Sequence, residues 1–225
     1  MPNTIFWNLV IPLVLQAITV AALYQYMVHR VDGVCQVEEY WKRKFDKEYL
    51  IVALIMLISG GLVYAKGYFG NDDGWVRAMM NAEVMIWLWA AGYIDLKERI
   101  IPNALILAGL LFWLVLCLME VLLGGTPVLR LLAYSGIGGL VCGGVLFVIA
   151  LIVKSALGMG DVKLFFVLGL LYGMSDAYGI LLFTVIALGI TSIALLIAKK
   201  VTMKTAIPMA PFVIIGFALS ILAGM

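Results

Sequence analysis

The stretch GILLFTVIALGITSIALLIA, residues 179–198, contains no charged side chain. A helix of about 20 mostly apolar residues is long enough to cross the hydrocarbon core of a bilayer. A helix on the surface of a soluble protein would instead carry a polar face beside its apolar one. The stretch therefore predicts a transmembrane helix. An all-α fold follows, because the lipid interior admits only helices and closed barrels.

Other apolar stretches follow the same pattern, so we expect an all-α polytopic membrane protein with about eight transmembrane helices. The expected spans are residues 5–28, 50–69, 78–94, 104–123, 131–153, 162–174, 179–198 and 207–223. The sixth is short, which is tolerated only where the neighbouring backbone is buried in protein or lines a cavity. No linker rich in Pro, Gly or Ser separates the spans, so we expect residues 1–225 to form a single domain.

The composition excludes a water-soluble globule. The chain is 65% hydrophobic and 12% charged, with a mean hydropathy of +1.13, whereas an ordinary soluble domain is about 45–50% apolar. Its net charge of +2 comes without a long basic run. We therefore expect the lipid bilayer, and no nucleic acid, as a partner.

The basic residues predict which way the chain crosses the membrane, because cytoplasmic loops are enriched in Lys and Arg. If the N-terminus lies outside, twelve of the 15 Lys and Arg residues fall in inward loops, and only Lys66, Arg77 and Arg130 lie outward. We therefore expect the N-terminus outside the cytoplasm. The polar residues 29–49 would then form a short cytoplasmic segment along the membrane surface.

The three cysteines indicate neither a disulfide framework nor a metal site. Cys35, Cys117 and Cys142 form no CxxC pair and lack the spacing of metal ligands. The two within expected spans behave as small apolar residues. We expect neither a metal nor a cofactor.

Small residues mark a packing surface in the fifth expected span. Ser135, Gly139 and Gly143 stand four residues apart and so share one face of a helix. Such a face lets a second helix approach closely. We interpret it as a packing seam and assign it no chemistry.

Two aspartates stand at the ends of expected spans, both on the expected cytoplasmic side. Asp95 ends the third span in GYIDLKERIIPN, and Asp161 precedes the sixth in KSALGMGDVKLFF. An ionisable residue at the membrane is a functional hypothesis by default. Each also has a simpler interpretation, since Asp95 could pair with Lys97 or Arg99 at the interface and Asp161 could cap a helix.

The two aspartates together suggest hydrolysis. Two neighbouring carboxylates hold one proton between them, because like charges resist joint ionisation. The ionised carboxylate then draws a proton from water, while the protonated one polarises a peptide carbonyl. Helix dipoles favour Asp161 as the base and Asp95 as the acid. Gly158 and Gly160 provide backbone that an extended peptide can approach.

These residues resemble the type IV prepilin peptidase family, whose pattern has an aspartate upstream of an I-P-N element and a second aspartate in G-x-G-D. Here the first aspartate is Asp95, and the elements read IPN at 101–103 and GMGD at 158–161. A late proline element, IPMAPF at 207–212, is also similar to the family's closing helix. The resemblance implies Asp95 and Asp161 as catalytic residues, supported by Gly158, Gly160, Lys163, Pro102, Asn103 and Pro208.

The resemblance implies an aspartyl endopeptidase of the plasma (inner) membrane, with its active site facing the cytoplasm. Its substrate would be a type IV prepilin or a pseudopilin- or archaellin-like precursor, cut after the leader's terminal glycine and next to the hydrophobic segment. Larger bacterial members carry two CxxC pairs between the first two spans and also methylate the new N-terminus. Only Cys35 stands in that loop here, so we expect a peptidase without zinc or methyltransfer.

Two other interpretations stay open. Tyr93-Ile94-Asp95, GMGD and a late proline also resemble presenilin or signal peptide peptidase, but those enzymes place their aspartates on adjacent core helices and end in Pro-Ala-Leu. Here two expected spans separate Asp95 from Asp161, and Phe212 follows Pro211. A small ion or proton transporter is the second alternative, although it predicts acids near the bilayer midplane.

Overall fold

The computed structural model describes residues 2–31, 47–70, 74–124, 127–152, 157–200, 202, 205 and 207–224. Within these residues the chain contains helices and no strand, which confirms the predicted all-α class. The elements are α1 (Pro2–Val31), α3 (Lys47–Gly70), α4 (Gly74–Glu98), α5 (Asn103–Met119), the π-helical turn η1 (Glu120–Gly124), α6 (Val128–Ile152), α7 (Met159–Ile197) and α8 (Ala210–Leu222).

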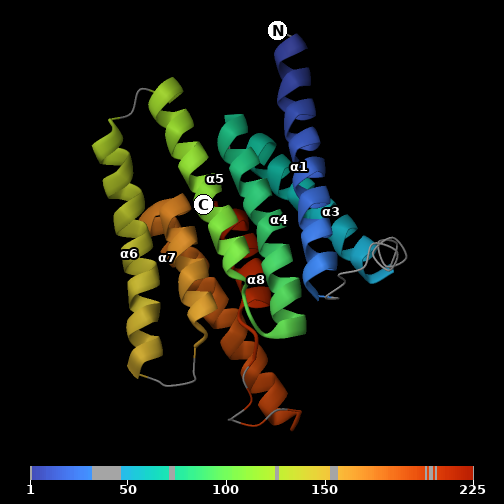
Figure 1. Cartoon of the computed structure of the whole chain (residues 1–225), viewed down its shortest axis with the longest axis vertical. Helices are drawn as coiled ribbons and strands as arrows, with labels where there is room; N and C mark the ends of the chain where they lie inside the picture. Colours follow the sequence, from blue (N-terminus) through green and yellow to red (C-terminus); the bar gives the residue numbers. More distant parts are fainter. Residues whose placement is uncertain are drawn as a thin grey trace.

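The helices run up and down in sequence order (Figure 1). We call the end where α1, α4 and α6 finish and α3, α5, α7 and α8 begin the lower end, as it is drawn in Figure 1, and the opposite end the upper end. Each predicted apolar stretch overlaps a helix. The successive helices of the described chain therefore run in opposite directions, as expected for consecutive membrane spans joined by short loops.

α7 contains both the sixth and the seventh predicted stretches. Its backbone leaves the helical conformation only at Gly173, with φ 70° and ψ −173°. Glycine adopts this positive φ readily because it has no Cβ. The chain rises from the lower end, turns over at Gly173 and descends again (Figure 1), so one residue performs the reversal for which the sequence suggested a short loop.

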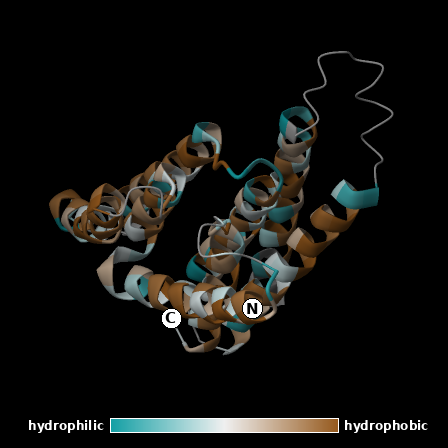
Figure 2. Ribbon diagram, turned by 90° about the horizontal axis from the view of Figure 1, so that it is seen from below, coloured by the Kyte–Doolittle hydropathy of each residue, from teal (hydrophilic) through white to brown (hydrophobic). Residues whose placement is uncertain are grey.

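Five of the described helical stretches are long and apolar enough to cross a membrane, namely Asn8–Arg30, Lys47–Gly70, Asn103–Leu122, Val128–Ile152 and Met159–Ile197. The helices are mostly hydrophobic along their length, with hydrophilic segments near several of their ends (Figure 2), and many large apolar side chains are exposed. A multi-pass membrane protein accounts for this pattern. Eight crossings and an outside N-terminus stay predictions.

α4 is a central helix that packs against α1, α3, α5 and α8. Ala82, Ile86 and Ala90 on it are fully buried. Because protein rather than lipid surrounds α4, it can carry polar residues such as Asn81 and Glu83, which are buried too. This explains why α4 is absent from the helices apolar enough to face lipid.

α6 and the ascending half of α7 touch backbone to backbone. A Cβ on Gly138 would overlap the carbonyl oxygen of Gly169, and a Cβ on Gly143 would lie 2.8 Å from Cβ of Phe166. Gly139 likewise faces Phe166, whose carbonyl oxygen would lie 3.2 Å from an added Cβ. The packing seam predicted from glycines in the fifth span is therefore confirmed.

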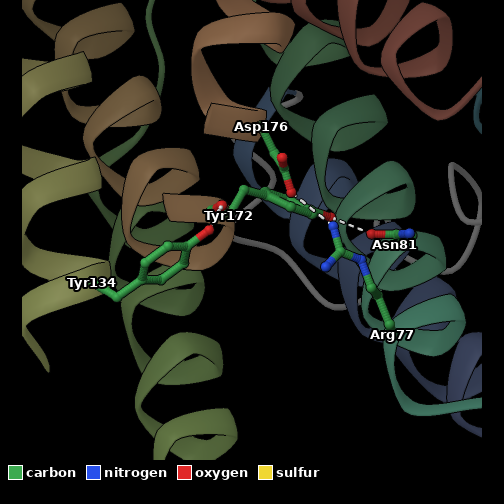
Figure 3. A network of polar contacts seen from close by, with 5 residues as sticks. All are labelled: Arg77, Asn81, Tyr134, Tyr172 and Asp176. Atoms are coloured by element: carbon green, nitrogen blue, oxygen red, sulfur yellow. Dashed lines mark hydrogen bonds and ion pairs between the residues drawn. The ribbon is translucent and has the colours of Figure 1, made fainter. Parts of the chain in front are cut away.

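A polar network ties α4 to α6 and α7 at the upper end (Figure 3). Arg77 Nη2 donates to Asp176 Oδ2 at 2.7 Å, and the Tyr172 hydroxyl donates to Asn81 Oδ1 at 2.9 Å. The Tyr134 hydroxyl donates to the carbonyl oxygen of Tyr172 at 3.3 Å. Hydrogen bonds across membrane helices of this kind hold neighbouring elements in register, so α4 and α7 are fixed to each other far from their lower ends.

Replacing Gly138 by Ala should lower the Tm of the purified protein, because the added methyl group would overlap the backbone of Gly169 and Gly173. Overpacking of this kind costs about 1–3 kcal/mol. Gly136→Ala is the matched control on the same helix, since a Cβ there meets nothing within 4 Å. We expect its Tm to stay level or rise slightly, because Ala is the better helix former. Equal Tm values for the two variants would contradict the backbone contact.

Candidate active site

A cavity of about 560 Å³ opens at the lower end, where α4 ends and α5 and α7 begin. Asp95 and Asp161 both line it. Its other walls are formed by Tyr26, Arg30, residues 99–104, residues 158–160 and Lys163. The fold thus brings the two predicted aspartates to one cavity, although α5 and α6 separate them along the chain.

Asp95 lies near the end of α4 and is only 5% exposed. Its Oδ2 accepts a hydrogen bond from the backbone N–H of Ala210 at 3.1 Å. Ala210 is the first residue of α8, and the first N–H groups of a helix lack partners within the helix and carry the positive end of its dipole. The start of α8 therefore stabilises negative charge on Asp95.

Gly92, about one turn before Asp95, lets α8 come close. A Cβ at Gly92 would lie 2.8 Å from Ile214 Cδ1 and 3.5 Å from Pro211 Cα. Pro211 stands in the first turn of α8, where a proline costs no hydrogen bond within the helix. The missing side chain at Gly92 thus permits the approach that gives Asp95 its backbone donor.

Asp161 lies in the first turn of α7, three residues after the N-cap Gly158. The simpler interpretation of the sequence made Asp161 the N-cap of this helix. In the structure Gly158 occupies that position instead. Its carboxylate interacts with the backbone of Gly158 and is repelled by the carboxylate of Asp95. The first interaction is that of the acid in a capping box. The second arises because Asp161 and Asp95 line the same cavity.

Two contacts fasten the loop before α5 to the start of α7. Gly160 packs on Ile101, since a Cβ at Gly160 would lie 3.0 Å from Ile101 Cβ. Lys163 Nζ donates to Asn103 Oδ1 at 2.9 Å. Pro102 is buried and is the N-cap residue of α5, with φ −65°, so its ring helps to fix the entry to that helix. These residues, predicted as supporting ones, surround the cavity together.

Pro208 is placed differently from the other predicted residues. It precedes α8 by two positions and is not among the residues that line the cavity. The proline element instead supplies the N–H of Ala210, which the sequence did not reveal because a backbone donor has no side-chain signature. Gly92 was also missed, although GYID places it on the helix of Asp95, about one turn earlier.

Two basic residues near the cavity, Arg30 and Lys97, have acidic partners on neighbouring helices. Lys97 Nζ lies 2.9 Å from Glu48 Oε2, and Arg30 Nε lies 3.3 Å from Glu98 Oε2. Exposed pairs of this kind contribute about 0–1 kcal/mol each. Lys97 therefore reaches toward α3, whereas one interpretation of the sequence paired it with Asp95.

No group of three or more His, Cys, Asp or Glu side chains that could hold a metal ion occurs among the described residues. Cys117 and Cys142 are buried free thiols. Cys35 and residues 32–46 of the expected surface segment lie outside the described residues.

Two carboxyl groups in one water-accessible cavity can carry out acid–base catalysis. Two carboxyl groups that lie close enough to resist joint ionisation retain one proton between them. The pair then offers a base for a water molecule and an acid for a carbonyl oxygen. Asp161 is more exposed than Asp95, so water can reach the pair from the cavity.

A family model described as the type IV leader peptidase family matches residues 82–193. The matched region contains both aspartates, the loop before α5 and the start of α7. No curated protein and no solved structure matches the chain.

Cysteines placed at positions 101 and 160 should form a disulfide under mild oxidation. An added Cβ at Gly160 lies 3.0 Å from Ile101 Cβ. Disulfides join Cβ atoms that are about 3.5–4.5 Å apart, so a small outward shift of either residue brings the two into bonding range. The pair Ile101→Cys and Gly160→Cys would be made with Cys35, Cys117 and Cys142 replaced by Ala, and thiol alkylation followed by mass spectrometry would measure the bond. The control pair, Ile101→Cys with Gly136→Cys, should stay reduced. A reduced 101/160 pair would show that the two segments are not neighbours.

Proposed function

We propose that this chain, which belongs to the type IV leader peptidase family, is a membrane aspartyl endopeptidase that removes the leader peptide from a type IV prepilin-like precursor. The observation that carries the proposal is the presence of Asp95 and Asp161 in one cavity at the lower end of the bundle. Asp95 precedes residues 99–104 and Asp161 follows residues 158–160, and these two segments form other walls of the cavity.

In the proposed reaction, a water molecule lies between the two carboxyl groups. The ionised carboxylate takes a proton from this water as its oxygen bonds to the peptide carbonyl carbon, while the protonated carboxyl donates to the carbonyl oxygen. The carboxyl that took the proton from water then gives it to the amide nitrogen, while the other carboxylate takes a proton back from a hydroxyl of the tetrahedral intermediate, and the C–N bond breaks. No covalent intermediate with the chain is formed, and the pair ends with one proton, as it began.

The structure changes the argument about which aspartate is the base. From the sequence, only Asp161 was expected beside a helix N-terminus. Asp95 also accepts an N–H from the start of α8, so both acids receive the same kind of stabilisation. The helix dipoles therefore no longer indicate which aspartate is the base and which is the acid. We assign the shared proton to the pair as a whole and not to either residue.

The six residues predicted as supporting ones would hold the backbone around the dyad in place. Gly160 against Ile101, and Lys163 against Asn103, join the start of α7 to the loop before α5. Gly158 leaves room for the Asp161 carboxylate, because a Cβ there would lie 3.1 Å from Asp161 Oδ2. Pro102 and Pro208 would act by fixing the backbone that enters α5 and α8.

The charge distribution supports a cytoplasmic active site in the plasma (inner) membrane. In the described chain, basic residues at the lower end are Arg30, Lys47, Lys97, Arg99, Lys163, Lys199 and Lys200, and those toward the upper end are Lys66, Arg77 and Arg130. By the positive-inside rule the lower end faces the cytoplasm. The N-terminus would then lie outside, and the two halves of α7, with α4 and α8, would complete eight crossings.

Asp95→Asn and Asp161→Asn should each abolish leader removal, by about a thousandfold or more, because neither amide can hold the proton that the pair exchanges. The purified variants would be incubated with a prepilin and the loss of the leader followed by mass spectrometry. Asp176→Asn is the matched control, since it makes the same change on α7 at the upper end and its amide oxygen can still accept the hydrogen bond from Arg77. It should cleave at close to the normal rate.

Wild-type processing by either dyad variant would contradict the mechanism. Cleavage of a signal-peptide remnant in place of the prepilin would favour the signal peptide peptidase alternative. The mass of the product also tests the methylation prediction, because a peptidase alone leaves an unmodified N-terminal amine.

A further inference from the structure

An apolar groove lies between α5 and α6, with the ascending half of α7 as its floor. It encloses about 650 Å³. Leu107 and Leu110 of α5 form one wall, Gly144 and Phe147 of α6 the other, and Phe166 of α7 the base. Apart from Asn103 and Lys163, the residues lining it carry no polar side chain.

The groove adjoins the cavity that holds the two aspartates. Asn103 and Lys163 line both spaces, and they are hydrogen-bonded to each other at 2.9 Å. The two polar residues of the groove therefore stand at its lower end, next to the dyad. From Asn103 to Leu110 the wall of α5 rises roughly 10 Å, or about two helical turns.

From these observations we propose that the groove binds the apolar helix that follows the scissile bond of the precursor. This inference rests on the proposed function. A segment that leaves the dyad and enters lipid must satisfy its backbone groups internally, so it must be helical. Its apolar side chains would replace lipid against Leu107 and Phe147, which are 57% and 43% exposed.

Gly144 gives the groove a place where a second helix can come close. A Cβ there would meet nothing within 4 Å, so the backbone of α6 is open at this position. Helices in membranes associate mainly through close packing at small residues. Gly144 is distinct in this respect from Gly143, whose face is already filled by Phe166.

A second cavity, on the other side of α5, is a poorer site for an apolar helix. It encloses about 310 Å³ between α1, α4 and α5 and shares no lining residue with the dyad cavity. Glu83 lines it, is only 8% exposed, and has an Oε1 without a partner among the described residues. An apolar occupant would leave that oxygen unsatisfied, which is costly in lipid.

The test fills each space separately and compares two substrates. Gly144→Trp blocks the α5–α6 groove, and Gly136→Trp is its matched control, because Gly136 is equally open on the same helix but lies outside the groove. Ala108→Trp blocks the second cavity, which Ala108 lines. The substrates are the full precursor and a soluble peptide that ends a few residues after the scissile bond.

We expect Gly144→Trp to raise the KM for the full precursor about tenfold and to leave the soluble peptide unaffected, since uniform binding energy is lost without a change in chemistry. Gly136→Trp and Ala108→Trp should behave as the wild type with both substrates. A photoreactive residue at position 107 in the Asp161→Asn variant should also cross-link to the full precursor.

Normal kinetics of Gly144→Trp with the full precursor would overturn the inference. A raised KM for the full precursor in Ala108→Trp rather than in Gly144→Trp would also overturn it. An equal loss of activity toward both substrates in Gly144→Trp would do the same. These outcomes leave the peptidase intact. A wild-type protein that cuts neither substrate would overturn the proposed function itself, and the groove assignment with it.

Discussion

The hydrogen bond from the N–H of Ala210 to Asp95 joins the last helix to the central one, and the candidate site depends on it. Asp95 is almost fully buried, and a buried carboxylate without a donor is costly. The start of α8 supplies that donor at 3.1 Å. Gly92 allows the approach, and the proline element fixes where α8 begins. A residue near the end of the chain thus supplies the hydrogen bond that favours the ionised form of a carboxylate in its middle.

The sequence predicted the helical class, the positions of the apolar stretches and the glycine seam, because each follows from local composition. The closeness of Asp95 and Asp161 followed from topology, since one aspartate comes at the end of a helix and the other at the start of a later one on the same side. The reversal at Gly173 was not predicted, because the sixth and seventh expected spans were separated by residues 175–178. Those residues instead lie in the descending half of α7.

Contacts between residues that lie far apart in the sequence could not be predicted, because each one involves two helices whose packing the sequence pattern does not specify. Nothing in the spacing joins Gly160 to Ile101, or Arg77 to Asp176, since each contact depends on how helices far apart in sequence pack. The contacts that hold the candidate site in place are also between residues far apart in the sequence. Asp95 and Asp161 are held at the lower end by loop contacts, while the network of Arg77, Asn81 and Tyr172 fixes α4 and α7 at the upper end. Burial of α4 permits both polar regions on one helix.

The reversal at Gly173 also limits how far the ascending half of α7 reaches. From Met159 to Tyr172 this half measures roughly 21 Å at about 1.5 Å per residue, against about 30 Å for the hydrocarbon core of a bilayer. Protein rather than lipid surrounds most of this arm, since Leu164, Phe165 and Leu168 are fully buried, so its short length is tolerated. The turn at Gly173 would then lie at membrane depth, where the packing of α6 and α8 on α7 keeps its backbone away from acyl chains.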